Sequence, residues 1–390
     1  MERIAEAMLT LSGSVTTLAI LLIIIFLFKE GFGLFNTPSV EKGYVLCVHS
    51  SNPVEQFTPY QIKQIFDGEI TEWNGKKIYP FRFDDIFYEY SEEEFGEDYE
   101  LLPQKLGEVI AQNPNIIAFI PEQYLPQENR SVKILPIENI NIADFFAGKE
   151  WLPTATPSPL FGVLPLIMGT LWVSIFAILI ALPLGLGVAI YMSELASARM
   201  RKFLKPTIEL LAGIPSVVYG FFGLVVLVPL IQKILNLPVG ETAFAGSIVL
   251  AIMALPTIIT IAEDAMRGTP SAMREASLAL GATSWQTIYK VIVPYASSGI
   301  MAAVVLGIGR AIGETMAVLM VTGNAAVMPH SLFQPVRTIP ATIAAELGEA
   351  PAGGGHYQSL FLLGSILFAI TMIISVSAEL ISKRSYNKGV

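Results

Sequence analysis

The sequence has 390 residues, of which 53% are hydrophobic and only 15% are charged, and its mean hydropathy is +0.58. This apolar content exceeds what the core of a soluble domain needs, so the lipid bilayer is the expected solvent for much of the chain. The formal net charge is −9, and its distribution along the chain is uneven.

Six stretches are long and apolar enough to cross a hydrocarbon core about 30 Å thick. The first is long enough to span, and no Ala-x-Ala-like cleavage site follows it. Pro and Gly occur inside several of the stretches, as membrane helices tolerate. The six predicted spans are 8–28, 161–191, 208–235, 244–266, 297–322 and 360–381.

Basic residues in the short loops set the expected orientation. They gather after the second, fourth and sixth spans, whereas the opposite short loops hold only Lys233 and Arg337. This bias predicts that both termini are cytoplasmic. Because these loop flanks are the only basic clusters, nucleic-acid binding is not expected. The residues are Arg199, Arg201, Lys202, Lys205, Arg267, Arg274, Lys290, Lys383, Arg384 and Lys388.

The segment between the first two spans has a different pattern. Strand-like runs such as 43–48 alternate with helical ones such as 58–67, which predicts a small α/β domain facing outward. Residues 41–150 hold 20 acidic and 9 basic side chains, a net charge of −11. Such a surface repels anions over roughly 8 Å at physiological salt, so it is poorly suited to concentrating them.

Enzymatic and metal-binding signals are missing. The acidic run 88–98 lacks the spaced ligands and turn glycine of an EF-hand loop. The three histidines are far apart, and no nucleophile–base pair or phosphate-cradling Gly loop is present. We therefore expect no catalytic residue, no metal site and no cofactor. Cys47, the single cysteine, lies in a predicted strand and is expected to pack in the core.

The stretch 269–294 predicts a helix–Gly–helix elbow. Residues 269–271 supply capping types before a short amphipathic helix over 272–280, Gly281 ends that helix, and Thr283 caps the next one. Arg274, Glu275, Ala276 and Ser277, followed at fixed spacings by Gly281 and Pro294, resemble the EAA loop of ABC importer permeases. In that family the loop couples the membrane helices to a separate ATPase, which would bind ATP and Mg²⁺. An ordinary interfacial turn is the alternative.

Further motifs narrow the resemblance to phosphate permeases of the PstC type. They cover about 147–383 and lie at 161–165, 169–171, 193–195, 213–221 and 309–317. The resemblance implies a bacterial inner-membrane importer of inorganic phosphate with a MetI-like, type I permease fold. It also implies three partners: a PstA-type permease subunit, a PstB-type ATPase dimer and a PstS-type binding protein.

Two residues are candidates for the substrate pathway. Arg310 and Glu314 are four residues apart in the fifth predicted span, so we expect them on one helix face. An ionisable group there costs at least about 2.5–3.5 kcal/mol on insertion scales. Arg310 offers a planar fork for phosphate oxygens, and Glu314 would hold that fork between substrates. The resemblance assigns both to the translocation route. A structural ion pair is the alternative.

Two other features have open readings. Gly213 and Pro215 are expected to break the third span, as a gate hinge or as a tolerated kink. Glu263 and Arg267 are also four apart, and a snorkelling surface pair is favoured over a substrate site for them.

The segment between the spans shows a second resemblance. Residues 52–73 and 113–121 resemble parts of periplasmic phosphate-binding proteins. Where those proteins place Arg followed by Ser-Gly-Thr, this chain has Arg82, Phe83, Asp84 and Asp85, so the anion donors are replaced by acids. We expect this segment to dock the true binding protein or to add shape alone, without binding phosphate.

The predicted organisation has three parts. Residues 1–31 form the first span, 32–158 the periplasmic α/β insert, and 159–390 a permease core with five spans and the coupling loop 269–294. A permease for another oxyanion, such as molybdate, sulfate or phosphonate, is the nearest alternative function. A membrane sensor or scaffold that transports nothing is a more distant one, because it would not need the coupling loop.

Overall fold

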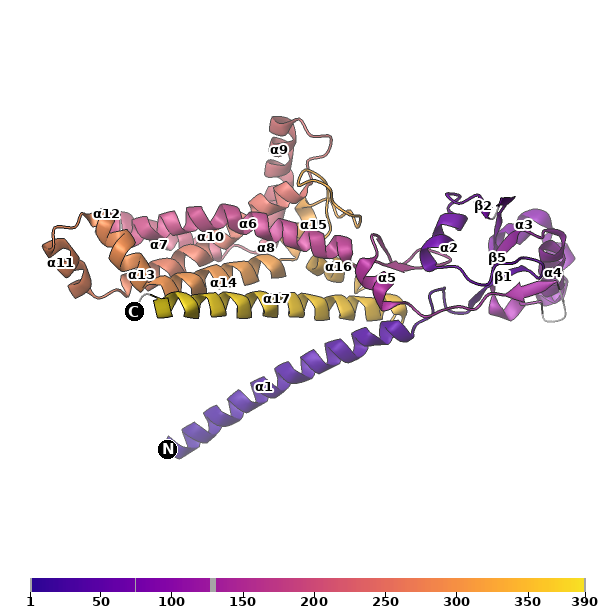
Figure 1. Cartoon of the computed structure of the whole chain (residues 1–390), viewed down its shortest axis with the longest axis horizontal. Coiled ribbons are helices and arrows are strands. Elements are labelled where there is room, and N and C mark those ends of the chain that lie inside the picture. The colour runs from indigo at the N-terminus through magenta and orange to yellow at the C-terminus, as the bar shows by residue number, and fades with distance from the viewer. Residues whose placement is uncertain (1, 74, 127–130, 389–390) are drawn as a thin grey trace. The chain divides into compact units, whose positions relative to one another are not determined.

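The computed structural model describes residues 2–73, 75–126 and 131–388. The chain forms two compact units, which are described separately and can be followed in Figure 1. The helical unit comprises Met1–Gly31, Leu164–Ala350 and Leu360–Val390. The insert unit comprises Phe32–Val163 and Pro351–Ser359.

Each of the six predicted spans has a counterpart among the described helices. Five helices are long and apolar enough to cross a membrane, and a sixth crossing results if the bent pair Ser284–Tyr295 and Ser297–Gly313, which meet at 71°, is one span. The five are Met8–Asn36, Leu164–Leu195, Ser216–Leu235, Ala243–Arg267 and Gly355–Ser377.

The centre of the helical unit is α10 (Ala243–Arg267), which packs against α6 (Leu164–Ile190) and α14 (Ser297–Gly313). Small residues make this close packing possible. A Cβ added to Gly185 of α6 or to Gly307 of α14 would lie 2.8 Å from the Ile258 side chain of α10. Such contacts let helix backbones approach closely, which stabilises packing in lipid where apolar burial alone gives little.

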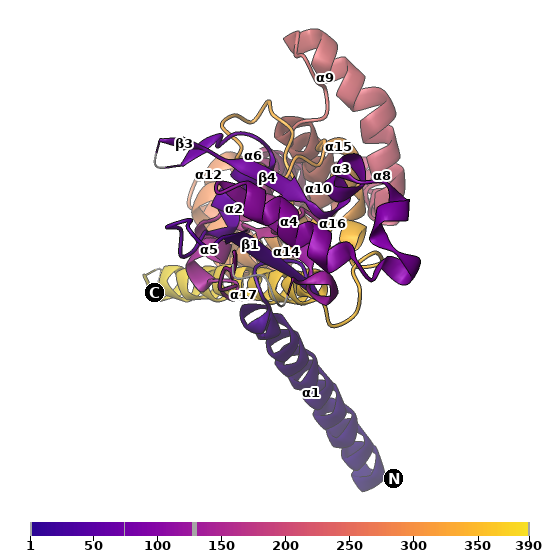
Figure 2. The same ribbon diagram turned by 90° about the vertical axis from the view of Figure 1, so that its right-hand side faces the viewer.

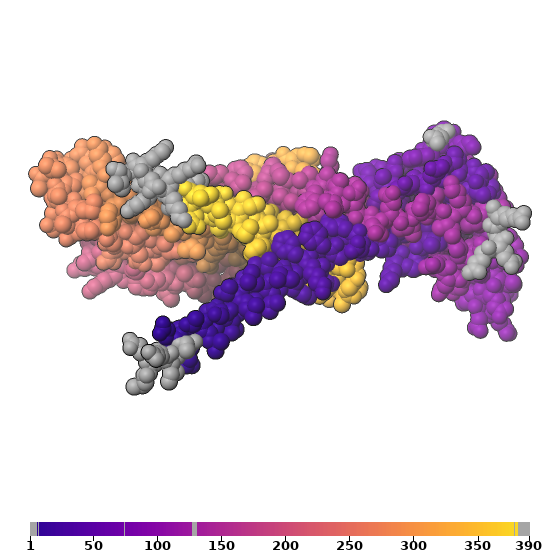
Figure 3. All heavy atoms as spheres, turned by 60° about the horizontal axis from the view of Figure 1, so that its bottom comes forward, coloured from indigo at the N-terminus to yellow at the C-terminus, as the bar shows by residue number. Residues whose placement is uncertain are grey.

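Helix α1 (Glu2–Phe32) contacts the rest of the helical unit near its C-terminal end. Phe26 packs edge-on against Phe361 of α17 (Gly355–Lys388), and Gly31 lies against the Leu362 backbone. Figure 3 shows α1 as an indigo rod that diverges from the other helices towards its N-terminus. Because its apolar side chains there are exposed, lipid or another subunit must cover them in a membrane.

The third predicted span is interrupted where Gly213 and Pro215 were expected to break it. Helix α7 (Ala198–Ala212) ends at Gly213, and Pro215 (ψ 143°) has left the helical conformation. The apolar span then runs from α8 (Ser216–Phe222) to α9 (Val228–Leu235), so it begins at Ser216 rather than at residue 208.

The fifth predicted span is also not one helix. Helix α14 ends at Gly313, and α15 (Met316–Val321) is a separate element. The predicted helix over 297–322 is therefore wrong at its C-terminal end. The other elements of this unit are η6 (Tyr191–Leu195), η7 (Gly223–Leu227), α11 (Ser271–Ala279), α12 (Ser284–Thr287), η8 (Ile288–Ile292), α13 (Val293–Tyr295) and α16 (Ile339–Glu346).

The insert unit is the expected α/β fold. Its four-stranded sheet has the order β4-β5-β1-β6, with β1 (Tyr44–His49) antiparallel to β5 (Ile116–Pro121) and to β6 (Val132–Ile134), and β4 (Tyr79–Arg82) parallel to β5. Helix α2 (Pro59–Phe66) packs on one face and α4 (Leu102–Gln112) on the other, and both are labelled in Figure 2. The strand and helix predicted at 43–48 and 58–67 are thus confirmed.

Short elements complete the insert unit. They are η1 (Gly33–Asn36), β2 (Glu72–Trp73), β3 (Lys76–Lys77), η2 (Phe83–Asp85), α3 (Ile86–Glu89), η3 (Glu92–Phe95), η4 (Glu97–Tyr99), η5 (Glu122–Tyr124), α5 (Ile142–Ala147), β7 (Trp151–Leu152) and β8 (Leu160–Phe161). Cys47 is fully buried in the core between the sheet and α4, as predicted.

Candidate functional site

The predicted helix–Gly–helix elbow is present. Helix α11 ends at Ala279 with Leu280 at its C-cap, and Gly281 has φ +84°, a conformation that an L side chain adopts only with strain. Thr283 caps α12 reciprocally, since its Oγ1 accepts from Gln286 N while Gln286 Oε1 accepts from Thr283 N. The start of α11 differs from expectation, because Pro270 occupies the N-cap position and no side chain caps the helix there.

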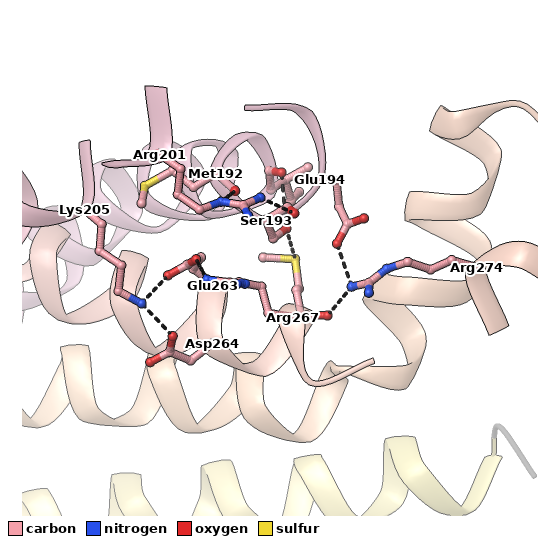
Figure 4. Close-up of polar contacts among 11 residues, drawn as sticks. Met192, Ser193, Glu194, Arg201, Lys205, Glu263, Asp264, Arg267 and Arg274 are labelled. Carbon is pink, nitrogen blue, oxygen red and sulfur yellow. Dashed lines mark hydrogen bonds and ion pairs between the residues drawn. The ribbon is translucent and has the colours of Figure 1, made fainter. Parts of the chain in front are cut away.

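The two charged residues of the elbow point to different partners. Glu275 is exposed and makes no ion pair within the described part of the chain. Arg274 is half-buried and folds back, with Nη2 2.9 Å from Glu194 Oε1 (Figure 4). The same Nη2 lies 2.9 Å from Met266 O, and Nη1 lies 3.0 Å from Thr269 O. Arg274 thus fastens α11 to the end of α10 and to η6, whereas Glu275 stays available to another molecule.

A hydroxyl pair joins the two arms of the elbow. Ser277 Oγ on α11 lies 2.9 Å from Thr287 Oγ1 on α12. Ser277 is the position that departs from the Ala of the EAA pattern, so the substitution adds a tie that Ala could not make. Apolar side chains remain exposed on the outside of the elbow, with Leu280 89% and Trp285 61% accessible.

The predicted pathway residues do not form the expected pair. Arg310 lies in the last turn of α14 and donates from Nη1 to Thr257 Oγ1 of α10 at 3.3 Å. Glu314 is already extended (ψ 132°), and its Oε1 accepts from Ala317 N of α15 at 3.5 Å. No ion pair joins Arg310 to Glu314 within the described residues, so the expectation that they share one helix face is wrong. Sequence reasoning missed Thr257.

The glycines near Arg310 differ in surroundings. Gly307 packs against Ile258, but a Cβ added at Gly309 or Gly313 would meet nothing within 4 Å. The latter two therefore border open space in the isolated chain, which a pathway or a second subunit could occupy.

The break at Gly213 and Pro215 is adjacent to α15. Tyr219 of α8 donates from its hydroxyl to Leu211 O of α7 at 2.8 Å, so this carbonyl beside the break has a side-chain donor in addition to Ile214 N. A Cβ on Gly220 would lie 2.9 Å from Ala317 Cα, so α8 and α15 are in direct backbone contact. The segment that contains Glu314 therefore leads directly into a helix that α8 touches.

A buried carboxylate lies at the end of α10. Glu263 has a side chain only 1% exposed, and it accepts from Arg267 Nη1 at 3.3 Å and from Lys205 Nζ of α7 at 3.0 Å. The predicted Glu263–Arg267 pair is present, but it is not a surface pair. The hydrogen bond to Glu263, followed by one to Asp264, raises the pKa of Lys205. Sequence reasoning missed Lys205 because 58 residues separate it from Glu263.

In the insert unit, the carboxylate of Asp85 accepts a backbone hydrogen bond at the place where the binding-protein pattern has its anion donors. Asp85 Oδ2 accepts from Arg82 N at 2.7 Å, which is a donor that a bound phosphate would otherwise use. The Arg82 guanidinium donates to Thr156 O at 3.2 Å and to Phe66 O at 3.4 Å, and it lies over the Phe66 ring. The backbone N–H and the guanidinium of Arg82 are therefore both engaged inside the chain.

These elements together describe a polytopic helical protein with an elbow whose outer residues are exposed. Residues 181–385 match the family of binding-protein-dependent transport system inner membrane components, and the chain belongs to this family. Members are permease subunits of transporters rather than enzymes. The predicted all-α polytopic permease class is confirmed.

Within the family, the relatives found include PstC phosphate permeases. The chain is 41% identical over 254 residues to the phosphate transport system permease protein PstC of Mesorhizobium japonicum, covering 60% of this chain and 76% of that protein. It is 37% identical over 265 residues to PstC of Pasteurella multocida, covering 63% and 81%. The chain is thus a homologue of PstC-type permeases, as predicted.

Two further similarities were found. The chain is 44% identical over 248 residues to the probable ABC transporter permease protein YqgH of Bacillus subtilis, covering 64% of this chain and 80% of that protein. Among solved structures, an inward-facing MetNI methionine ABC transporter matches with a TM-score of 0.46 and 18% identity, covering 57% of this chain and 96% of that chain.

Proposed function

We propose that the chain is the membrane-spanning permease subunit of an ATP-driven importer of inorganic phosphate. The similarity to PstC phosphate permeases carries this proposal. Arg310 supports it, because a guanidinium in an otherwise apolar helix can bind phosphate oxygens with its planar fork. Its side chain donates to the Thr257 hydroxyl at 3.3 Å, and within the described residues it makes no ion pair with Glu314. Such an arginine is free to exchange a weak partner for an anion.

The partners in this proposal follow from the family. A PstA-type permease subunit completes the pathway, a PstB-type ATPase dimer binds ATP and Mg²⁺, and a PstS-type protein delivers phosphate. This chain itself needs no cofactor. Glu275 and the exposed apolar residues of the elbow support the proposal that α11 binds in a groove of the ATPase. A short helix held rigidly at a membrane surface can transmit motion from such a groove.

The proposed topology has both termini in the cytoplasm and residues 32–158 in the periplasm of a bacterial inner membrane. The excess of Lys and Arg in the loops after the second and fourth spans supports this orientation. In this arrangement the elbow at 269–294 faces the ATPase, and the acidic insert faces the binding protein.

The insert unit is proposed to be a docking surface rather than a phosphate receptor. Asp85 and the contacts of Arg82 occupy the donors that a receptor would use. An open hollow of about 440 Å³, lined by residues that include Tyr60, Asp144 and Phe161, lies within the unit and could seat a side chain of the binding protein. Deletion of 41–149 with unchanged uptake would contradict the docking role.

The test is reconstitution of the complete transporter in liposomes. We expect the chain to co-purify with an ATPase whose hydrolysis rises with phosphate and its binding protein, and labelled phosphate to accumulate inside. Excess molybdate, sulfate or phosphonate should not compete. Competition by one of these anions at equal concentration would instead identify the chain as a permease for that oxyanion. Absence of any stimulated hydrolysis would favour a sensor or scaffold.

A further inference from the structure

Two helices hold the same turn at the end of α6. Arg201 of α7 donates from Nε to Met192 O at 2.8 Å and from Nη2 to Ser193 O at 2.9 Å. From the other side, Arg274 of α11 pairs with Glu194 at 2.9 Å. The last carbonyls of a helix have no intrahelical partners and carry partial negative charge, so cations bind them well. The π-helical turn η6 is therefore held by α7 and by α11 together, as Figure 4 shows.

A second set of contacts connects the same two helices through α10. Lys205 of α7 lies 3.0 Å from Glu263 and 3.0 Å from Asp264, while Arg274 donates to Met266 O at 2.9 Å. Glu263 is only 1% exposed and also pairs with Arg267 at 3.3 Å, so loss of Lys205 would remove the nearer of two cations from a buried carboxylate, which is disfavoured. The contact between α7 and α10 is thus costly to open.

Helix α7 is a defined element rather than a loose loop. It runs for 15 residues, and Ser197 Oγ caps it by accepting from Met200 N at 3.3 Å. Two of its basic residues, Arg201 and Lys205, face the contacts above. A rigid helix attached at two points must follow the elements to which it is attached.

We propose that Glu194 and Glu263 are positioning residues that make α7 move together with the coupling helix α11. Helix α7 then delivers that motion to α8 through the break at Gly213 and Pro215. The inference rests on the proposed function, since it takes α11 as the element that contacts the ATPase.

The consequence for transport follows from the contacts of α8. Gly220 touches the backbone of α15 at Ala317, and α15 begins just after Glu314. A displacement of α7 that passes to α8, whose Tyr219 is bonded to Leu211 of α7, would therefore change the position of α15 and of the segment beside Arg310. A direct route also exists, because Arg310 is bonded to Thr257 of α10. Glu194 and Glu263 contact no substrate in this scheme and act only through the helices they hold.

The test uses the complete transporter with Glu194→Gln and Glu263→Gln. We expect the ATPase to co-purify at the normal level, because the outer face of the elbow is unchanged. The amount of phosphate transported per ATP hydrolysed should fall about fivefold or more, because coupling between two sites of a protein is typically worth at least about that factor. Glu194→Asp, which keeps a carboxylate, should retain most of the ratio. Glu209→Gln is the matched control, since Glu209 is an exposed acid of α7 and should leave the ratio unchanged.

A distance measurement separates positioning from a merely stabilising role. With spin labels at Lys202 of α7 and Ala279 of α11, the distance should stay constant between nucleotide-free and ATP-bound states of the complex. In the double variant with Glu194→Gln and Glu263→Gln, the distribution of this distance should broaden and should differ between the nucleotide-free and ATP-bound states. In the unaltered complex, the distance between labels at Lys202 and at Lys233 of α9 should change between these two states.

Three results would overturn the inference. One is an unchanged phosphate-to-ATP ratio in both variants, another is a distance between α7 and α11 that already changes in the unaltered complex, and the third is loss of the ATPase from the variants. Failure of the proposed function looks different, because the unaltered complex would then hydrolyse ATP without moving phosphate, while the spin-label distances would still report whether α7 follows α11.

Discussion

Arg310 and Glu314 lie on either side of a helix end. Arg310 is in the last turn of α14 and bonds to Thr257, whereas Glu314 is extended and caps the backbone of α15. Two ionisable groups that could neutralise each other are therefore held apart, each by a weak neutral partner. Within the described residues Arg310 has no carboxylate partner, and this supports the proposal that phosphate binds there.

Removal of this cation tests the pathway. Arg310→Ala should abolish phosphate uptake while the complex still assembles, because the side chain contributes a single hydrogen bond to the fold. Uptake of labelled phosphate and co-purification of the partner subunits measure the two effects. Lys233→Ala removes one exposed positive charge elsewhere and is the matched control. Normal uptake by the Arg310 variant would remove the residue from the pathway.

Thr257 should affect affinity rather than assembly. Its hydroxyl accepts from Arg310, and a hydrogen bond to a charged group is worth about 1.5–3 kcal/mol. Because phosphate replaces this bond in the proposed function, Thr257→Val should lower the KM for phosphate by roughly tenfold or more, given about 1.4 kcal/mol per factor of ten. Thr257→Ser keeps the hydroxyl and should transport normally. An equal KM for the Val and Ser variants would show that the bond has no role in transport.

Gly281 should be intolerant of any side chain. With φ +84° it adopts a left-handed conformation that costs other residues roughly 1–2 kcal/mol. Gly281→Ala should relieve this strain by distorting the elbow, which would reduce the amount of ATPase recovered with the permease. Gly187→Ala, in the last turn of α6 with nothing within 4 Å of the added Cβ, should leave recovery unchanged. Equal recovery for both variants would contradict the prediction.

Arg82 should matter for the stability of the insert unit and not for transport. Its guanidinium holds Thr156 and Phe66, while its backbone N–H is already bonded to Asp85. Arg82→Ala should lower the unfolding temperature of the purified protein yet leave the KM for phosphate unchanged. Calorimetry and uptake assays measure the two quantities. A raised KM would mean that the insert unit takes part in binding phosphate.

Cys47 should be unreactive in the folded protein. Burial raises the pKa of its thiol from 9.0 to about 12, so its thiolate fraction at pH 8 is about a thousandfold smaller than that of a free cysteine. Maleimide labelling at pH 8 should be slow until the protein is denatured. Because the folded pKa is the higher one, the thiol favours folding below pH 9.0, and this contribution is lost as the pH rises towards 12. Cys47→Ala should lack that pH dependence.

Local sequence rules were enough for much of the architecture. The lengths of apolar stretches predicted the spans, and alternating patterns predicted β1 and α2. The elbow was predictable because a left-handed Gly281 and the cap at Thr283 depend only on residues a few positions away. The family and the likeness to PstC were also recognisable from ordered motifs, and the comparisons confirm them.

Only the tertiary structure decided which distant side chains meet. Glu194 and Arg274 are 80 residues apart, and Lys205 and Glu263 are 58 apart, so no helical spacing relates them. Which faces pack together depends on the whole arrangement of α6, α7, α10 and α11. The end of α14 was hidden for the opposite reason, since 310–317 contain no proline and read as one continuous helix. The chain leaves the helix at Gly313 because α15 packs elsewhere, on α8, and that packing separates Arg310 from Glu314.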